Sequence, residues 1–123
     1  MDMLRARAAQ GRMPEGSIMH CFTGSWECAK VYLSLGMYIS LSGAVTFKNA
    51  PKLAEVATNM PADRLLVETD CPFTAPVPLR GKRNEPAFVV HTIEKIAGLR
   101  GISPEEMAEI TTANALRALR ITV

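Results

Sequence analysis

The chain lacks paired cysteines, a long apolar run and a large net charge. Its three cysteines form no CxxC pair, which argues against a disulfide framework or a cysteine-based zinc site and favours a reducing compartment. No stretch is long and apolar enough to span a membrane, and the N-terminal residues lack the apolar core of a signal peptide. A formal net charge of +2 is too small to indicate nucleic-acid binding by itself. We therefore expect a cytoplasmic protein that does not bind membranes.

The composition is that of a globular protein, and the pattern is α/β. The 123 residues, 48% of them hydrophobic, suffice for one domain, which we place at 1–123. Short apolar segments predict three buried strands: one within 17–22 that ends at His20, and two at 37–41 and 64–69. Caps, prolines and glycine stops predict helices at 3–10, 26–35, 51–59, from Pro86 to near Gly101, and from 104 to the mid-110s. This alternation predicts right-handed parallel βα units.

Polar side chains stand where the predicted strands end, namely His20, Ser42 and Asp70. The carboxyl ends of parallel strands share one rim of the sheet, so we expect these three residues on that rim. A carboxylate at the mouth of a buried strand is costly unless a metal, a cation or backbone donors bind it. Imidazole and carboxylate suit a divalent ion. Taken alone, His20 also fits a core histidine bonded to the backbone, and Asp70 a turn aspartate.

The longest irregular stretch, 71–84, follows Asp70 directly. Loops of this length are usually functional. Its cluster of Arg80, Lys82 and Arg83 fits either a solvated loop or contacts to phosphate. The remaining histidine, His91, lies off the apolar face of its predicted helix and is expected in solvent.

Four motifs resemble the TatD family of metal-dependent hydrolases and occur in the family's order. They are HCFTG at 20–24, YISLSG at 38–43, LVETDCP at 66–72 and RGKRNEP at 80–86. The similarity extends from about residue 18 to residue 119 and includes Thr112 and Asn114 in the last predicted helix.

The resemblance implies a TIM-type (β/α)8 barrel. Such a barrel typically needs about 250 residues, so this chain would form its last part, about three strands. Two divalent ions are expected at the carboxyl rim of the complete barrel, with Mg, Mn and Zn not distinguished. His20 would be a metal ligand, and Asp70 both a metal ligand and the catalytic aspartate. The family's paired histidines, middle-strand glutamate and fifth-strand histidine have no counterpart here.

Five further residues are assigned to the site by the same motifs. Glu68 would stand beside the metal ligands or act as a structural ion-pair partner. Arg80 and Arg83 would meet phosphates or the protein's own carboxylates. Asn84 and Glu85 open the next helix, and we expect Glu85 to pair with a neighbour and hold the rim loop.

The function implied by the resemblance is hydrolysis of DNA phosphodiester bonds with divalent metal ions. Two alternatives remain. In the first, the chain is an inactive truncated fragment or an assembly piece that self-associates through open sheet edges. In the second, it belongs to a metallo-hydrolase that acts on a different ester or amide, because the fold and the metals do not determine the substrate.

Overall fold

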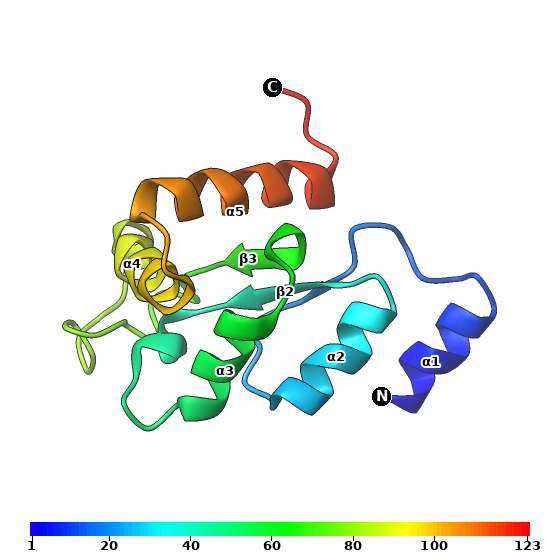
Figure 1. Ribbon diagram of the computed structural model, residues 1–123, viewed down its shortest axis with the longest axis horizontal. Coiled ribbons are helices and arrows are strands. Elements are labelled where there is room, and N and C mark those ends of the chain that lie inside the picture. Colours follow the sequence, from blue (N-terminus) through cyan, green and yellow to red (C-terminus); the bar gives the residue numbers. More distant parts are fainter.

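The computed structural model describes residues 1–123 and contains a three-stranded parallel sheet with helices around it (Figure 1). The strands are β1 (Ile18–Met19), β2 (Tyr38–Leu41) and β3 (Leu65–Val67), in the order β1-β2-β3. The α-helices are α1 (Asp2–Ala9), α2 (Trp26–Ser34), α3 (Pro51–Asn59), α4 (Val89–Arg100) and α5 (Pro104–Leu119). Three short 3-10 helices complete the elements: η1 (Gly43–Thr46), η2 (Ala62–Arg64) and η3 (Pro86–Phe88). The predicted parallel βα units are confirmed.

Helix ends lie where local signals predict them. The Ser25 hydroxyl accepts a hydrogen bond from the Cys28 backbone N–H at the start of α2, and the Ser103 hydroxyl accepts one from Glu106 in α5. Pro51 is the first residue of α3, where a missing N–H costs no helical hydrogen bond. Gly101 ends α4 with a φ of +69°, a conformation that glycine adopts without strain.

The outer strands are shorter than predicted. β1 contains two residues, and both are half-buried rather than buried, because β1 is an edge strand with β2 as its sole neighbour. His20 therefore follows β1 instead of ending it. β3 ends at Val67, and the chain then turns at Asp70, whose φ of +58° is incompatible with an extended strand.

The two sheet faces pack differently. Ile39, Leu41 and Leu65 share one face and join a core with residues of α2, α3, α4 and α5. The other face carries Tyr38 and Leu66, which pack against the C-terminal half of α5. In Figure 1, α2 and α3 lie below the strands and α5 runs above β3. The rim loops after β2 and β3 lie at the left, where both arrowheads point.

The sheet is open at both edges. β1 and β3 each have one neighbouring strand, so the chain does not close a barrel by itself. The buried Asn114 amide of α5 donates to the carbonyls of Ala62 and Leu65, which satisfies two backbone acceptors at the start of β3. Three parallel strands agree with the predicted last part of a barrel. None of the helices combines the length and apolarity needed to cross a membrane.

Replacing Arg100 by alanine is expected to lower the free energy of unfolding by about 2 kcal/mol. The Arg100 guanidinium donates from Nη1 to the carbonyls of Ala57 and Met60 at 2.8 and 2.9 Å, closing the C-terminal end of α3. Urea denaturation measures the loss. The control is Arg5→Ala, because Arg5 makes an exposed contact with Asp2 at 3.9 Å and should change stability by less than about 0.5 kcal/mol. Equal effects of the two substitutions would contradict the assigned role of Arg100.

Candidate metal centre

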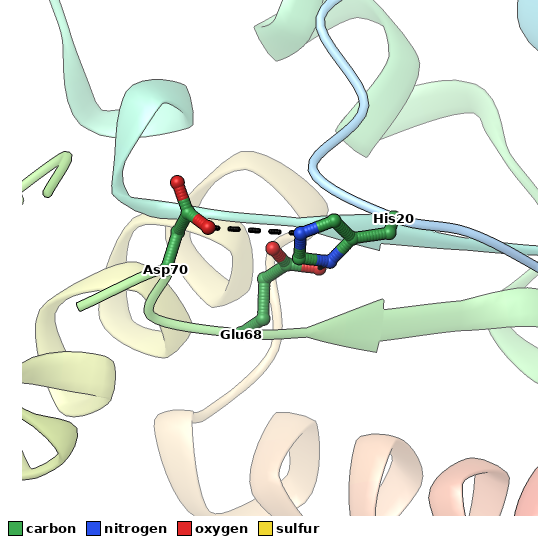
Figure 2. Close-up of side chains that lie close together, drawn as sticks. All are labelled: His20, Glu68 and Asp70. Atoms are coloured by element: carbon green, nitrogen blue, oxygen red, sulfur yellow. Dashed lines mark hydrogen bonds and ion pairs between the residues drawn. The ribbon is translucent and has the colours of Figure 1, made fainter.

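Three side chains with metal-binding atoms meet at the carboxyl rim: His20, Glu68 and Asp70 (Figure 2). One ligand atom from each can be chosen so that all three lie within 4.8 Å of one another. His20 Nδ1 is 2.9 Å from Glu68 Oε2, and His20 Nε2 is 3.6 Å from Asp70 Oδ1. The imidazole thus lies between two carboxylates that are two residues apart in the chain.

The strand register explains this meeting. Ile18 pairs with Tyr38 and Ser40 pairs with Leu66, so these four residues share the sheet face opposite the main core. Two residues further along the chain, His20 and Glu68 continue the same alternation beyond the ends of β1 and β3. Their side chains therefore project to one side of the rim, 48 positions apart in sequence.

Glu68 holds the imidazole in place. Its Oε2 lies 2.9 Å from His20 Nδ1 and accepts the Cys21 backbone N–H at 3.1 Å. An ionised carboxylate can only accept, so this contact places the imidazole proton on Nδ1 and leaves the Nε2 lone pair directed toward Asp70. The other carboxylate oxygen, Oε1, is buried without a hydrogen-bond partner. A buried acceptor without a donor is costly, and a cation would satisfy it.

The donor set fits one divalent ion. Two ligand atoms about 2.1 Å from a tetrahedral ion are separated by about 3.4 Å, and the Nε2–Oδ1 distance here is 3.6 Å. A histidine bonded through Nδ1 to a carboxylate, with Nε2 free, is the arrangement that metal-ligating histidines usually have. The His20 side chain is 70% exposed, so an ion has access from solvent. This geometry does not distinguish Mg, Mn and Zn.

Cys21 and Ser42 line the side of Asp70. The Cys21 sulfur lies 3.6 Å from Ser42 Oγ and 3.9 Å from Asp70 Oδ2. Ser42 therefore lies at the predicted rim in contact with Cys21, and it makes no hydrogen bond with His20. Cys21 was not predicted as a site residue, although its position next to His20 in the HCFTG motif was a usable signal.

The rim loop is held by Asn84, not by Glu85. The Asn84 side chain is 2% exposed and donates to the carbonyls of Thr69 and Phe73 at 2.8 and 2.7 Å. Its Oδ1 accepts the Glu85 N–H at 2.9 Å. The Glu85 carboxylate makes no ion pair or hydrogen bond, so the prediction that it pairs with a neighbour is wrong. A neutral amide can donate to two carbonyls and accept an N–H at once, which a carboxylate cannot do.

The loop also packs closely on η1. A Cβ at Gly43 would lie 2.3 Å from the Thr74 carbonyl oxygen, so only glycine allows this approach. The Thr46 hydroxyl accepts the Val77 N–H at 2.8 Å. These contacts fix the segment that begins immediately after Asp70.

The basic residues of the rim loop, Arg80, Lys82 and Arg83, form no ion pair with a carboxylate of the protein. The Arg80 guanidinium stacks on the Phe47 ring, 3.8 Å from its centroid, and donates to Asn49 Oδ1 at 3.4 Å. Arg83 lines a cavity of about 360 Å³ together with Asn84 and Glu85. The remaining histidine, His91, is half-buried on α4, lies 3.3 Å from Glu94 and does not belong to the metal-binding group.

Comparison with known proteins identifies the family. The sequence model of the family described as TatD related DNase matches residues 1–120. The chain belongs to the TatD family. This match agrees with the resemblance of its four motifs and with its parallel βα units.

Relatives within the TatD family carry names of hydrolases. The chain is 51% identical over 120 residues to YabD of Bacillus subtilis (strain 168), named an uncharacterized metal-dependent hydrolase, with 98% of this chain and 47% of YabD covered. It is 39% identical over 111 residues to a protein of Erwinia billingiae named 3'-5' ssDNA/RNA exonuclease TatD, with 86% of this chain and 42% of that protein covered.

A solved structure of the family has the same fold over this region. The crystal structure of YJJV, a TatD homolog from Escherichia coli K12, superposes with a TM-score of 0.86 at 26% sequence identity. The match covers 98% of this chain and 47% of YJJV. The chain therefore spans about half the length of the relatives that it matches.

Proposed function

We propose that this TatD-family chain supplies the His20, Glu68 and Asp70 side of a divalent-metal centre that hydrolyses DNA phosphodiester bonds. The observation that carries the proposal is the imidazole held between two carboxylates, with Nε2 3.6 Å from Asp70 Oδ1. His20 and Asp70 are the proposed ligands. Glu68 is the group that fixes the imidazole, and a cation near its buried, unpartnered Oε1 would satisfy that acceptor.

A divalent ion at such a site lowers the pKa of water and stabilises charge on phosphoryl oxygens. The chain's own residues have separate tasks. Glu68 keeps the Nδ1 proton of His20 in place, so that Nε2 stays available as a ligand. Asp70 has one oxygen toward His20 and the other near Cys21, which leaves a carboxylate that can both bind a cation and accept a proton. Asn84 keeps the chain after Asp70 in position through its hydrogen bonds to Thr69 and Phe73.

These donor atoms would hold one ion. The two-ion centre expected from the family needs further ligands from outside this chain. One group of three metal-binding side chains is present here. Because the chain spans 47% of YabD, the rest of a barrel can be supplied by the part of YabD that this chain does not match. A chimera of the two therefore provides the test.

The YabD chimera is expected to cleave an oligonucleotide in the presence of Mg, Mn or Zn salts and to lose that activity in EDTA. The chain alone should show little or no cleavage, because it lacks the other ligands. Product analysis by gel electrophoresis measures both. Parallel assays on aryl and aminoacyl esters separate a nuclease from a hydrolase of other esters. Ester cleavage without DNA cleavage would contradict the proposed substrate.

A second candidate role is assembly, and the open edges of β1 and β3 favour it. Strands with unpaired edges offer backbone donors and acceptors to another chain. In this role the chain alone associates with itself without hydrolysing DNA. Light scattering distinguishes the two, because a monomer at all concentrations contradicts the assembly role.

A further inference from the structure

The rim loops of the metal centre carry a concentrated positive charge. Segments 42–53 and 71–85 contain five cations and a single acid, Glu85, a net charge of +4 that leaves −2 for the rest of the chain. The cations are Lys48, Lys52, Arg80, Lys82 and Arg83, all of them exposed. None of the five takes part in an ion pair. We name these five residues the basic rim. Charges of one sign gathered in neighbouring segments without acidic partners favour a polyanionic ligand.

An exposed aromatic residue, Phe73, lies in the same loop, between Asp70 and Arg80 in the sequence. The Phe73 side chain is 70% exposed, although burial of such a ring is normally favourable. Its backbone is fixed at both ends: the Phe73 N–H donates to the Asp70 carbonyl at 3.0 Å, and its carbonyl accepts from Asn84 at 2.7 Å. The ring is thus held in solvent three residues beyond Asp70, on a segment anchored by a buried side chain.

An aromatic face and unpaired cations together match single-stranded nucleic acid. Proteins bind such strands by stacking bases on aromatic rings while cationic side chains contact the phosphates. A duplex offers only the phosphates, because its bases are already stacked on one another. Acidic peptides would use the cations but would leave the Phe73 ring without a stacking partner.

We propose that Phe73 is a stacking platform for an unpaired base, and that the basic rim binds the adjoining phosphates, so that the site selects single-stranded nucleic acid. The proposal rests on the proposed function for its placement beside Asp70 and adds the residues that recognise the strand. Phe73 and the cations are binding residues, distinct from the group that would hold the ion.

The stacking platform is tested by fluorescence anisotropy. A labelled oligothymidylate of about fifteen nucleotides is titrated with the 123-residue chain in EDTA, so that no cleavage occurs. Phe73→Ala should weaken binding roughly tenfold, the loss of one stacked base, and Phe73→Trp should restore it. The matched control is Leu119→Ala, because Leu119 is also an exposed apolar side chain, 60% exposed, but lies at the end of α5. A blunt duplex of equal length should bind roughly tenfold more weakly, without dependence on Phe73.

The phosphate contacts are tested by salt dependence. The double variant Lys82→Ala/Arg83→Ala should reduce the slope of log K against log salt by roughly 1.4, because each of the two single-strand phosphate contacts contributes about 0.7. Arg5→Ala/Arg7→Ala on α1 removes the same charge away from the rim and should leave the slope unchanged. Urea denaturation confirms that each variant is folded.

The outcomes separate this inference from the proposed function. Cleavage of DNA by the YabD chimera with binding that is indifferent to Phe73 would overturn the platform and leave hydrolysis standing. Strand binding that depends on Phe73, with no metal-dependent cleavage, would support the platform and overturn hydrolysis. Equal affinity for the duplex, or equal salt slopes for the two double variants, would also overturn the inference.

Discussion

The Asp70→Asn variant of the YabD chimera is expected to lose more than a hundredfold of its hydrolytic rate. Loss of a group that merely supports a metal ligand costs about 10–100-fold in metal affinity or activity, and Asp70 is proposed as a ligand itself. Asparagine keeps the shape of the side chain but removes the negative charge facing His20 at 3.6 Å. Initial rates of oligonucleotide cleavage at saturating metal measure the effect.

Two comparison variants show whether the loss of rate is specific to Asp70. Asp63 is an exposed acid in η2 that lies outside the metal-binding group, so Asp63→Asn should leave the rate unchanged. Glu68→Gln should cost about 10–100-fold, because Glu68 orients His20 through its contact with Nδ1 at 2.9 Å. An Asp70→Asn rate equal to that of Asp63→Asn would rule out the proposed role of Asp70.

The Asn84→Ala variant is expected to lose about 3 kcal/mol of stability together with the ordered rim loop. The substitution leaves the carbonyls of Thr69 and Phe73 and the Glu85 N–H without their present partner. Thr69 directly precedes Asp70, so the loss should also weaken metal binding. Urea denaturation and metal titration of the same preparation measure the two effects.

The matched control is Glu85→Ala, because the Glu85 side chain is exposed and makes no ion pair. It should change stability by less than about 0.5 kcal/mol. Asn84→Asp should resemble Asn84→Ala, since a carboxylate cannot donate to the two carbonyls. Unfolding midpoints that are equal for Asn84→Ala and Glu85→Ala would show that the loop is held by other contacts.

The helices were predictable because their signals are local. Ser25 and Ser103 cap the helices that follow them, and Pro51 begins α3 where the sequence places it. The strand ends were less predictable, since they depend on backbone conformation and on neighbours. β3 ends at Val67 and the chain turns at Asp70, whose φ is +58°, and nothing in the adjacent residue types specifies this.

The charged residues of the site were predictable from the sequence, and the hydrogen bonds that hold the loop after Asp70 were not. His20 and Asp70 are expected on one rim because polar side chains at the ends of parallel strands converge, and the motif resemblance makes them metal ligands. The structure places His20 Nε2 3.6 Å from Asp70 Oδ1. Predicting the hydrogen bonds of Asn84 would require knowing which backbone carbonyls lack strand partners, and this depends on the tertiary structure. The exposure of Phe73 likewise follows from the path of the loop, since an aromatic residue in sequence normally indicates packing.

The metal centre itself is tested most directly by calorimetric titration of the 123-residue chain with Zn²⁺ or Mn²⁺. We expect one ion per chain. Binding should be lost in Asp70→Asn and in His20→Ala and unchanged in His91→Ala, because His91 lies outside the metal-binding group. Binding that survives both His20→Ala and Asp70→Asn, or no binding at millimolar metal, would contradict the proposed metal centre.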